Sequence, residues 1–215
     1  MNTVTEAKPS VTPFFHAPTG TWTYVVADPA SRAAAVIDPV LDYDWRSGRT
    51  GTKSADALVA HCTKERLEVA WILETHAHAD HLSAAPYLKS CLGGRIAIGR
   101  GILQVQATFK RIFGLGADFA ADGSQFDALL ADGDRIDLGA IPGQVIAAPG
   151  HTSDSVAYLV GDALFVGDTV FMPDGGSARC DFPGGDAAEL SRTVQRLYAL
   201  PAATRMFVCH DYSPG

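Results

Sequence analysis

The segment Thr75–His81, with the sequence THAHADH, holds three histidines and one aspartate in seven residues. It closely follows the apolar run Val69–Leu73, VAWIL, which predicts a buried strand. In layered α/β folds, binding and catalytic residues lie on the loops that follow the strands. The segment therefore predicts an α/β fold with a metal or catalytic site at the end of this strand.

The same residue types follow three other apolar runs of the chain. His151 lies in PGHTSDS, Asp168 in GDTVF and His210 in HDY. Imidazole and carboxylate groups are ligands for zinc and iron, and neutral imidazole binds metals at near-neutral pH. The sequence therefore predicts a metal centre with ligands drawn from His76, His78, Asp80, His81, His151, Asp168 and His210.

These candidate ligands are more numerous than one tetrahedral ion requires. They suit either two adjacent sites that share a bridging carboxylate, or one working site beside an unused one. His76 and His78, two positions apart on an extended turn, are expected to aim the same way. Asp80 and His81 are expected to begin a helix and to point toward a second position, and Asp80 suits a helix N-terminus electrostatically.

The composition indicates a folded globular protein. Of the 215 residues, 47% are hydrophobic and 19% charged, and the net charge of −7 argues against nucleic acid or an anionic membrane surface as a partner. No apolar run approaches the ~20 residues that a bilayer requires, and the N-terminus lacks the features of a secretory signal. Widely spaced cysteines indicate reduced thiols. We expect a single cytoplasmic domain over residues 1–215.

Hydrophobic periodicity predicts strands and helices in two similar halves. A hairpin is expected over Thr21–Asp28 and Ala33–Pro39. Helices are expected over Ser54–Glu68, Asp80–Gly93, Ile102–Gly116 and Asp186–Leu200. Further strands are expected over Val69–His76, 95–99, 134–139, 143–150, 156–161, 163–168 and Thr204–Tyr212, with a loop or lid from Gly114 to Gly133. This order predicts two sheets packed face to face with helices outside.

Some polar and aromatic residues are predicted to lie outside the site. The polar ones are interpreted as structural or exposed to solvent: His16, His61, Asp38, Asp134 and Asp137. Asp38 in VIDP is expected to form a turn, because Asp-Pro pairs favour turns. Phe109 and Phe113 in TFKRIF are expected in the core or an interface rather than in a substrate lid.

Four motifs in their order along the chain, THAHADH, PGHTSDS, GDTVF and HDY, resemble those of the metallo-β-lactamase superfamily. The H-x-H-x-D-H pattern is highly specific in this context, and the resemblance covers nearly the whole chain. It implies an αβ/βα sandwich, in which two mixed β-sheets carry helices on their outer faces and metals bind at one edge between the sheets.

A finer resemblance is to the persulfide dioxygenases, particularly their bacterial β-lactamase-hydrolase-like branch, and is carried by TWTYVVAD, ETHAHADHLSAAPYLK, ARCDFPGGD and HDY. It implies that the chain oxidises glutathione persulfide with O2 to sulfite and glutathione, using one Fe(II) per chain. By their places in the motifs, the iron ligands would be His76, His151 and Asp168. Two histidines and one carboxylate leave coordination positions open for substrate sulfur and for O2.

The same resemblance implies roles for the residues around the iron. His78, Asp80, His81 and His210 would form a second site, or would orient the ligands and tune the iron. The candidate catalytic residues are Asp80, His210, Tyr212 and Arg179, and the last two are candidates to contact the glutathione moiety. Cys180 is expected to be structural or a neighbour of the pocket rather than a nucleophile.

The resemblance also bears on the ends of the domain and on assembly. The family usually continues beyond HDY, so a C-terminal extension is expected to be missing after Gly215. The amphipathic segment Ile102–Gly116 could serve a homodimer.

Two alternatives to the dioxygenase remain. One is a hydrolase with two Zn(II), such as a glyoxalase II-type thioesterase or a lactonase, in which a metal-bound hydroxide attacks a carbonyl carbon. The number of ligands favours this alternative, whereas the flanking motifs favour a single iron. The other is a non-catalytic sensor or binding module, which would require broken ligands, and none is broken in this sequence.

Overall fold

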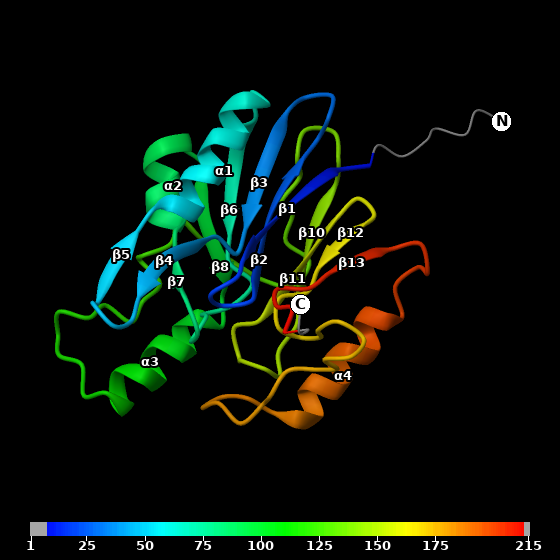
Figure 1. Ribbon diagram of the computed structural model, residues 1–215. Coiled ribbons are helices and arrows are strands. Elements are labelled where there is room, and N and C mark those ends of the chain that lie inside the picture. Colours follow the sequence, from blue (N-terminus) through cyan, green and yellow to red (C-terminus); the bar gives the residue numbers. More distant parts are fainter. Residues whose placement is uncertain (1–7, 213–215) are drawn as a thin grey trace.

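Two β-sheets packed face to face form the centre of the molecule (Figure 1). The computed structural model describes residues 8–212. The larger sheet has the order β1-β2-β3-β6-β8-β9 and the smaller the order β10-β11-β12-β13. Their strands are β1 Ser10–His16, β2 Thr21–Ala27, β3 Ala33–Ile37, β6 Glu68–Leu73, β8 Arg95–Gly99, β9 Ala128–Leu130, β10 Gly143–Ala147, β11 Val156–Val160, β12 Ala163–Phe165 and β13 Arg205–Phe207.

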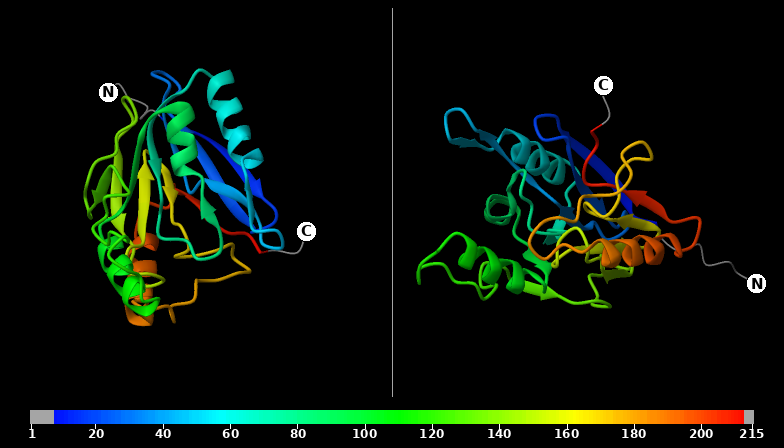
Figure 2. Two further views of the ribbon diagram at one scale, coloured as in Figure 1. Left: turned by 90° about the vertical axis from the view of Figure 1, so that its left-hand side faces the viewer. Right: turned by 90° about the horizontal axis from the view of Figure 1, so that it is seen from below.

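Helices cover the outer faces of both sheets (Figures 1 and 2). The helices are α1 Lys53–Lys64, α2 Ala85–Leu92, α3 Ile102–Ile112 and α4 Ala187–Tyr198. Leu58 of α1 and Leu88 of α2 pack on the larger sheet, and Leu197 of α4 packs on the smaller one. The αβ/βα sandwich expected from the sequence is therefore confirmed.

Alternating side chains of each strand fill different layers, because successive residues of a strand point to opposite faces. Ile37 joins Leu73, Tyr158 and Phe165 in the core between the sheets. Its neighbour Val36 packs outward against α1 and α2. Burial of both faces explains why β3 and β6 are continuous apolar runs in the sequence.

The predicted hairpin is confirmed, since β2 and β3 pair antiparallel. The helix expected from Asp80 begins only at Ala85, and Pro86 lies in its first turn, where proline is tolerated. Residues 82 and 83 instead form β7 (Leu82–Ser83), which pairs with β4 (Val40–Asp44) in a small sheet with β5 (Arg49–Gly51). The expectation that Asp80 and His81 start a helix was therefore wrong.

Other boundaries also differ from the prediction. Residues 134–139 form only isolated bridges, Arg135 with Gln144 and Leu138 with Ile141, rather than a strand. The expected loop up to Gly133 contains β9, which adds a strand to the edge of the larger sheet. Strand β1 was not predicted. It contains Pro13 and lies at the opposite edge of the sheet, where proline is tolerated. Within residues 8–212, no helix is long and apolar enough to cross a membrane.

Candidate metal centre

The loops that follow β6, β10 and β12 bring His76, His151 and Asp168 together. The Nε2 atoms of His76 and His151 each lie 3.7 Å from Oδ2 of Asp168. Ligand atoms bound to one ion at ~2.1 Å lie roughly 3 to 3.5 Å from one another. The three atoms are therefore close to the spacing that a shared metal ion requires.

Hydrogen bonds on the far side of each imidazole fix the direction of these two histidines. Nδ1 of His76 is 3.1 Å from Oγ1 of Thr75, and Nδ1 of His151 is 2.7 Å from the carbonyl oxygen of Arg179. This leaves both Nε2 atoms to face Asp168, an arrangement typical of metal-binding histidines. Burial lowers the pKa of His76 well below its usual value, so the ring is neutral and can act as a ligand.

A glycine permits the close packing of two of these loops. Gly167 adopts a φ of +54°, and a Cβ atom at this position would lie 2.6 Å from Oγ1 of Thr75. Only glycine combines this conformation with so close an approach. Gly167 therefore allows the loop that carries Asp168 to pack directly against Thr75, which orients His76.

His210 contacts Asp168 on its other oxygen. Its Nδ1 lies 2.6 Å from Oδ1 of Asp168, and its Nε2 lies 2.8 Å from Asp80 and 3.0 Å from Oγ1 of Thr21. Burial alone would lower the pKa of His210, but the hydrogen bonds to Asp168 and Asp80 raise it to about 9. The raised pKa favours the charged imidazolium form of His210 between the two carboxylates at neutral pH.

A second group of candidate ligands lies beside the first. Potential ligand atoms of Asp80, His81 and His210 lie within 4.8 Å of one another. Nε2 of His81 is buried and has no hydrogen-bond partner among the described residues. Burial and the charge of His78 lower the pKa of His81 to about 4, which leaves its nitrogen available for a metal.

His78 departs from the expectation that it aims the same way as His76. Its Nε2 lies 3.1 Å from Oδ1 of Asp38 and 3.5 Å from Oε2 of Glu74. Among the groups of described residues whose ligand atoms lie within 4.8 Å of one another, His78 groups with Asp38 and Glu74, or with His81 and Cys209. Burial lowers the pKa of His78, but the charges and hydrogen bonding of Asp38 and Glu74 together outweigh burial and raise this pKa well above the usual range.

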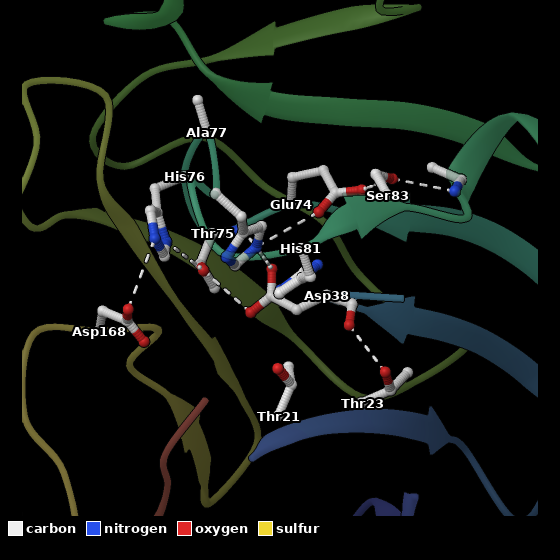
Figure 3. A network of polar contacts seen from close by, with 12 residues as sticks. Thr21, Thr23, Asp38, Glu74, Thr75, His76, Ala77, His81, Ser83 and Asp168 are labelled. Carbon is white, nitrogen blue, oxygen red and sulfur yellow. Dashed lines mark hydrogen bonds and ion pairs between the residues drawn. The ribbon is translucent and has the colours of Figure 1, made fainter. Parts of the chain in front are cut away.

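Asp38 is more than the turn residue that the sequence suggested. It does lie in a turn conformation, with a φ of +50°, but its side chain is buried and accepts hydrogen bonds from the backbone N–H and the hydroxyl of Thr75. Sequence reasoning also missed Glu74, which is buried beside it (Figure 3). The available signal was a charged residue between a buried strand and the histidine motif.

A cavity of about 710 Å³ opens over His76, His151 and Asp168. Its walls are largely apolar and aromatic, formed by Val105, Phe109, Phe113, Phe171, Phe182 and Tyr212. Phe109 and Phe113 thus face the candidate site, whereas the sequence favoured a core or interface position for them. The residues of α3 that are buried are Ile102 and Gln106, and Ile112 is half-exposed.

The predicted substrate-contact residues also border the cavity. The Arg179 guanidinium forms two hydrogen bonds with Asp181, of 2.6 and 2.7 Å, and lies 4.8 Å from the centre of the Phe182 ring. The Tyr212 ring is stacked on His210 with ring centres 5.3 Å apart. Cys180 is half-buried and lies outside the set of residues that line the cavity.

The residues interpreted as structural occupy ordinary positions. His16 is buried, with Nδ1 2.7 Å from the hydroxyl of Thr19, and His61 packs edge-on against Phe14. Asp137 is exposed and pairs with Arg135. Asp134 is half-buried and accepts a hydrogen bond from the backbone of Ala131.

The profile of the metallo-beta-lactamase superfamily matches residues 16–210, which includes every candidate ligand. The chain belongs to this superfamily. Metallo-β-lactamase superfamily members are metal-dependent enzymes, among them hydrolases and dioxygenases, and they bind metal ions through histidine and aspartate residues. The clustered histidines and aspartates of this chain fit that description.

Relatives of this metallo-β-lactamase domain carry several names. A probable metallo-hydrolase of Burkholderia pseudomallei is 52% identical over 212 residues, which cover 94% of this chain and 72% of that protein. A beta-lactamase hydrolase-like protein of Xylella fastidiosa is 50% identical over 96% of this chain. The chain spans about half of that relative, 48% of its length. The mitochondrial persulfide dioxygenase ETHE1 of Bos taurus is 31% identical over 89% of this chain and 64% of its own length.

Solved structures share the metallo-β-lactamase fold of this chain. ETHE1 from Myxococcus xanthus superposes with a TM-score of 0.74 at 29% identity, covering 94% of this chain and 76% of that one. TTHA1623, solved in a di-iron-bound form, superposes with a TM-score of 0.68 at 28% identity, covering 94% and 92% of the two chains.

Proposed function

We propose that this chain is a persulfide dioxygenase that works with a single iron ion. One observation carries the proposal. Two imidazole nitrogens and one carboxylate oxygen, from His76, His151 and Asp168, converge on one point, while the third histidine of the neighbourhood, His78, is hydrogen-bonded elsewhere. Two histidines and one carboxylate are the ligand set of non-haem iron oxygenases, which leave coordination positions open.

The substrate of this reaction would be glutathione persulfide. Its terminal sulfur is oxidised to sulfite, glutathione is released as the thiol, and O2 is the oxidant. Both atoms of O2 and one oxygen from water end in sulfite, and two protons are released. Ferrous iron supplies the electrons that activate O2 for this chemistry, which zinc cannot do.

The residues of the chain would bind the persulfide and keep water away from it. With substrate bound, the aromatic walls of the cavity would exclude water above the three ligands, which would strengthen electrostatic interactions inside. Arg179 is the arginine at this cavity that can meet a carboxylate of glutathione, because guanidinium and carboxylate groups form paired hydrogen bonds. Binding there would require Arg179 to exchange its present partner, Asp181.

A second candidate is a zinc hydrolase with two metal ions. The group of Asp80, His81 and His210, with the unpartnered Nε2 of His81, favours it. The relatives with the higher identities are named hydrolases or hydrolase-like, and one solved structure of this fold holds two irons. The position of His78, outside the ligand group of His76 and His151, supports the single-iron proposal against it.

Metal content measured together with O2 consumption tests the proposal. Protein purified without oxygen is expected to carry about one iron per chain. It should consume O2 and form sulfite only when glutathione persulfide is added. Two zinc ions per chain, with hydrolysis of thioesters or lactones and no O2 uptake, would establish the hydrolase instead.

A further inference from the structure

His76 and His78 differ in the groups that their imidazole rings contact. His76 directs Nε2 at Asp168, whereas His78 directs Nε2 at Asp38 and Glu74, at 3.1 and 3.5 Å. The two rings are nevertheless close, with centres 4.1 Å apart. A modest movement of His78 would therefore bring a third imidazole toward the metal centre.

Glu74 is held rigidly in a buried position. It is 3% exposed, and one carboxylate oxygen accepts a hydrogen bond from the hydroxyl of Ser83, which in turn accepts one from the backbone N–H of Ala85 (Figure 3). Its backbone carbonyl accepts a hydrogen bond from the hydroxyl of Tyr158. The other oxygen, Oε2, faces His78 and has no hydrogen-bond partner among residues 8–212. A buried carboxylate oxygen without another partner strongly favours keeping a donor beside it.

Asp38 supports the same position from the other side. Its carboxylate accepts hydrogen bonds from His78 and from the backbone and hydroxyl of Thr75. Asp38 also binds Thr75, which orients His76. A change at Asp38 would therefore affect both histidines. Among the polar contacts of residues 8–212, Glu74 pairs with His78 but not with His76, so a change at Glu74 acts on His78.

We propose that Glu74 holds His78 out of the metal centre and thereby limits the protein ligands there to two imidazoles and one carboxylate. This inference rests on the proposed single-metal function. A third imidazole would occupy a position that the oxygenase reaction needs open, and it would favour zinc, whose sites commonly contain three histidines. Glu74 is thus a positioning residue that acts through His78.

Cobalt(II) binding to metal-free protein tests this inference without substrate. Glu74→Met keeps a similar side-chain length but removes the carboxylate that pairs with the His78 imidazole. The visible absorption of bound cobalt should change in this variant, and zinc should bind about tenfold more tightly, within the range by which groups around metal ligands alter affinity. The double variant E74M/H78Q should restore the wild-type spectrum, and E74Q, which keeps an acceptor, should resemble wild type.

His78→Gln in the otherwise unchanged protein is the second measurement, in case Glu74→Met does not fold. The glutamine amide can still donate to the buried carboxylates. This variant should bind cobalt with the wild-type spectrum and stoichiometry. A folded E74M with unchanged cobalt spectrum and zinc affinity, or a spectrum altered by H78Q alone, would overturn the inference. If these results hold but the wild-type protein fails to consume O2 with persulfide, only the proposed function fails.

Discussion

Asp38 and Thr75 are joined by two hydrogen bonds, from the Thr75 backbone N–H to Oδ1 at 2.7 Å and from the Thr75 hydroxyl to Oδ2 at 2.9 Å. The same hydroxyl lies 3.1 Å from Nδ1 of His76. A carboxylate on the loop after β3 therefore determines, through one threonine, the direction of a candidate metal ligand after β6. Removing such an indirect contact typically weakens metal binding by about 10- to 100-fold.

Thr75→Val is expected to weaken metal binding by about 10- to 100-fold, because it removes the hydroxyl between Asp38 and His76 and keeps the shape of the side chain. Chelator competition measures the change. Thr23→Val is the matched control, since the Thr23 hydroxyl also donates to Asp38, but to its backbone carbonyl at 2.7 Å (Figure 3). Equal losses of affinity in the two variants would show that general destabilisation is responsible.

His151→Ala is expected to abolish metal binding and turnover together, because it removes one of three converging ligand atoms. Elemental analysis of the purified protein and O2 uptake measure the two effects. His16→Ala is the control: this histidine is buried but contacts Thr19 and Asp42 rather than the metal centre, so metal content should stay at the wild-type level. Full metal content in His151→Ala would refute the ligand assignment.

The clustering of the candidate metal ligands was predictable because it depends on topology. Strands that end at one edge bring the residues that follow them together, so His76, His151 and Asp168 could be grouped from their places after apolar runs. The direction of His78 could not be predicted. It depends on contacts with Glu74 and with Asp38, which is 40 positions away in the sequence. Local alternation along the chain contains no information about the contact with Asp38.

Local features explain the other differences. Pro86 placed the start of α2 later than the apolar pattern suggested, and residues 82 and 83 took backbone partners in β4 instead. Phe113 has the spacing of a core residue. However, α3 lies over the cavity, and Phe113 is 67% exposed. Periodicity predicts which side chains share a face of a helix, and the tertiary arrangement decides what that face meets.

Phe113→Ala is expected to lower kcat/KM for the proposed persulfide substrate by about tenfold, because it removes apolar surface that would contact the bound molecule. Metal content should not change. Ile112→Ala is the matched control, since Ile112 is the neighbouring exposed apolar residue and does not line the cavity. A similar loss in both variants would indicate an effect on α3 rather than on substrate binding.

Asp162→Asn is expected to lower the free energy of unfolding at neutral pH by about 0.5 to 1 kcal/mol, the range of ion pairs near the surface. The hydrogen bond from Arg205, at 2.6 Å, and a contact with Lys8 lower the pKa of Asp162 from 3.8 to about 2. The lowered pKa in the folded state means that this stabilisation is complete above about pH 4 and disappears as the pH falls toward 2. Urea unfolding of both proteins should therefore show a difference at pH 7 that shrinks between pH 4 and 2, and a difference independent of pH would contradict the assignment.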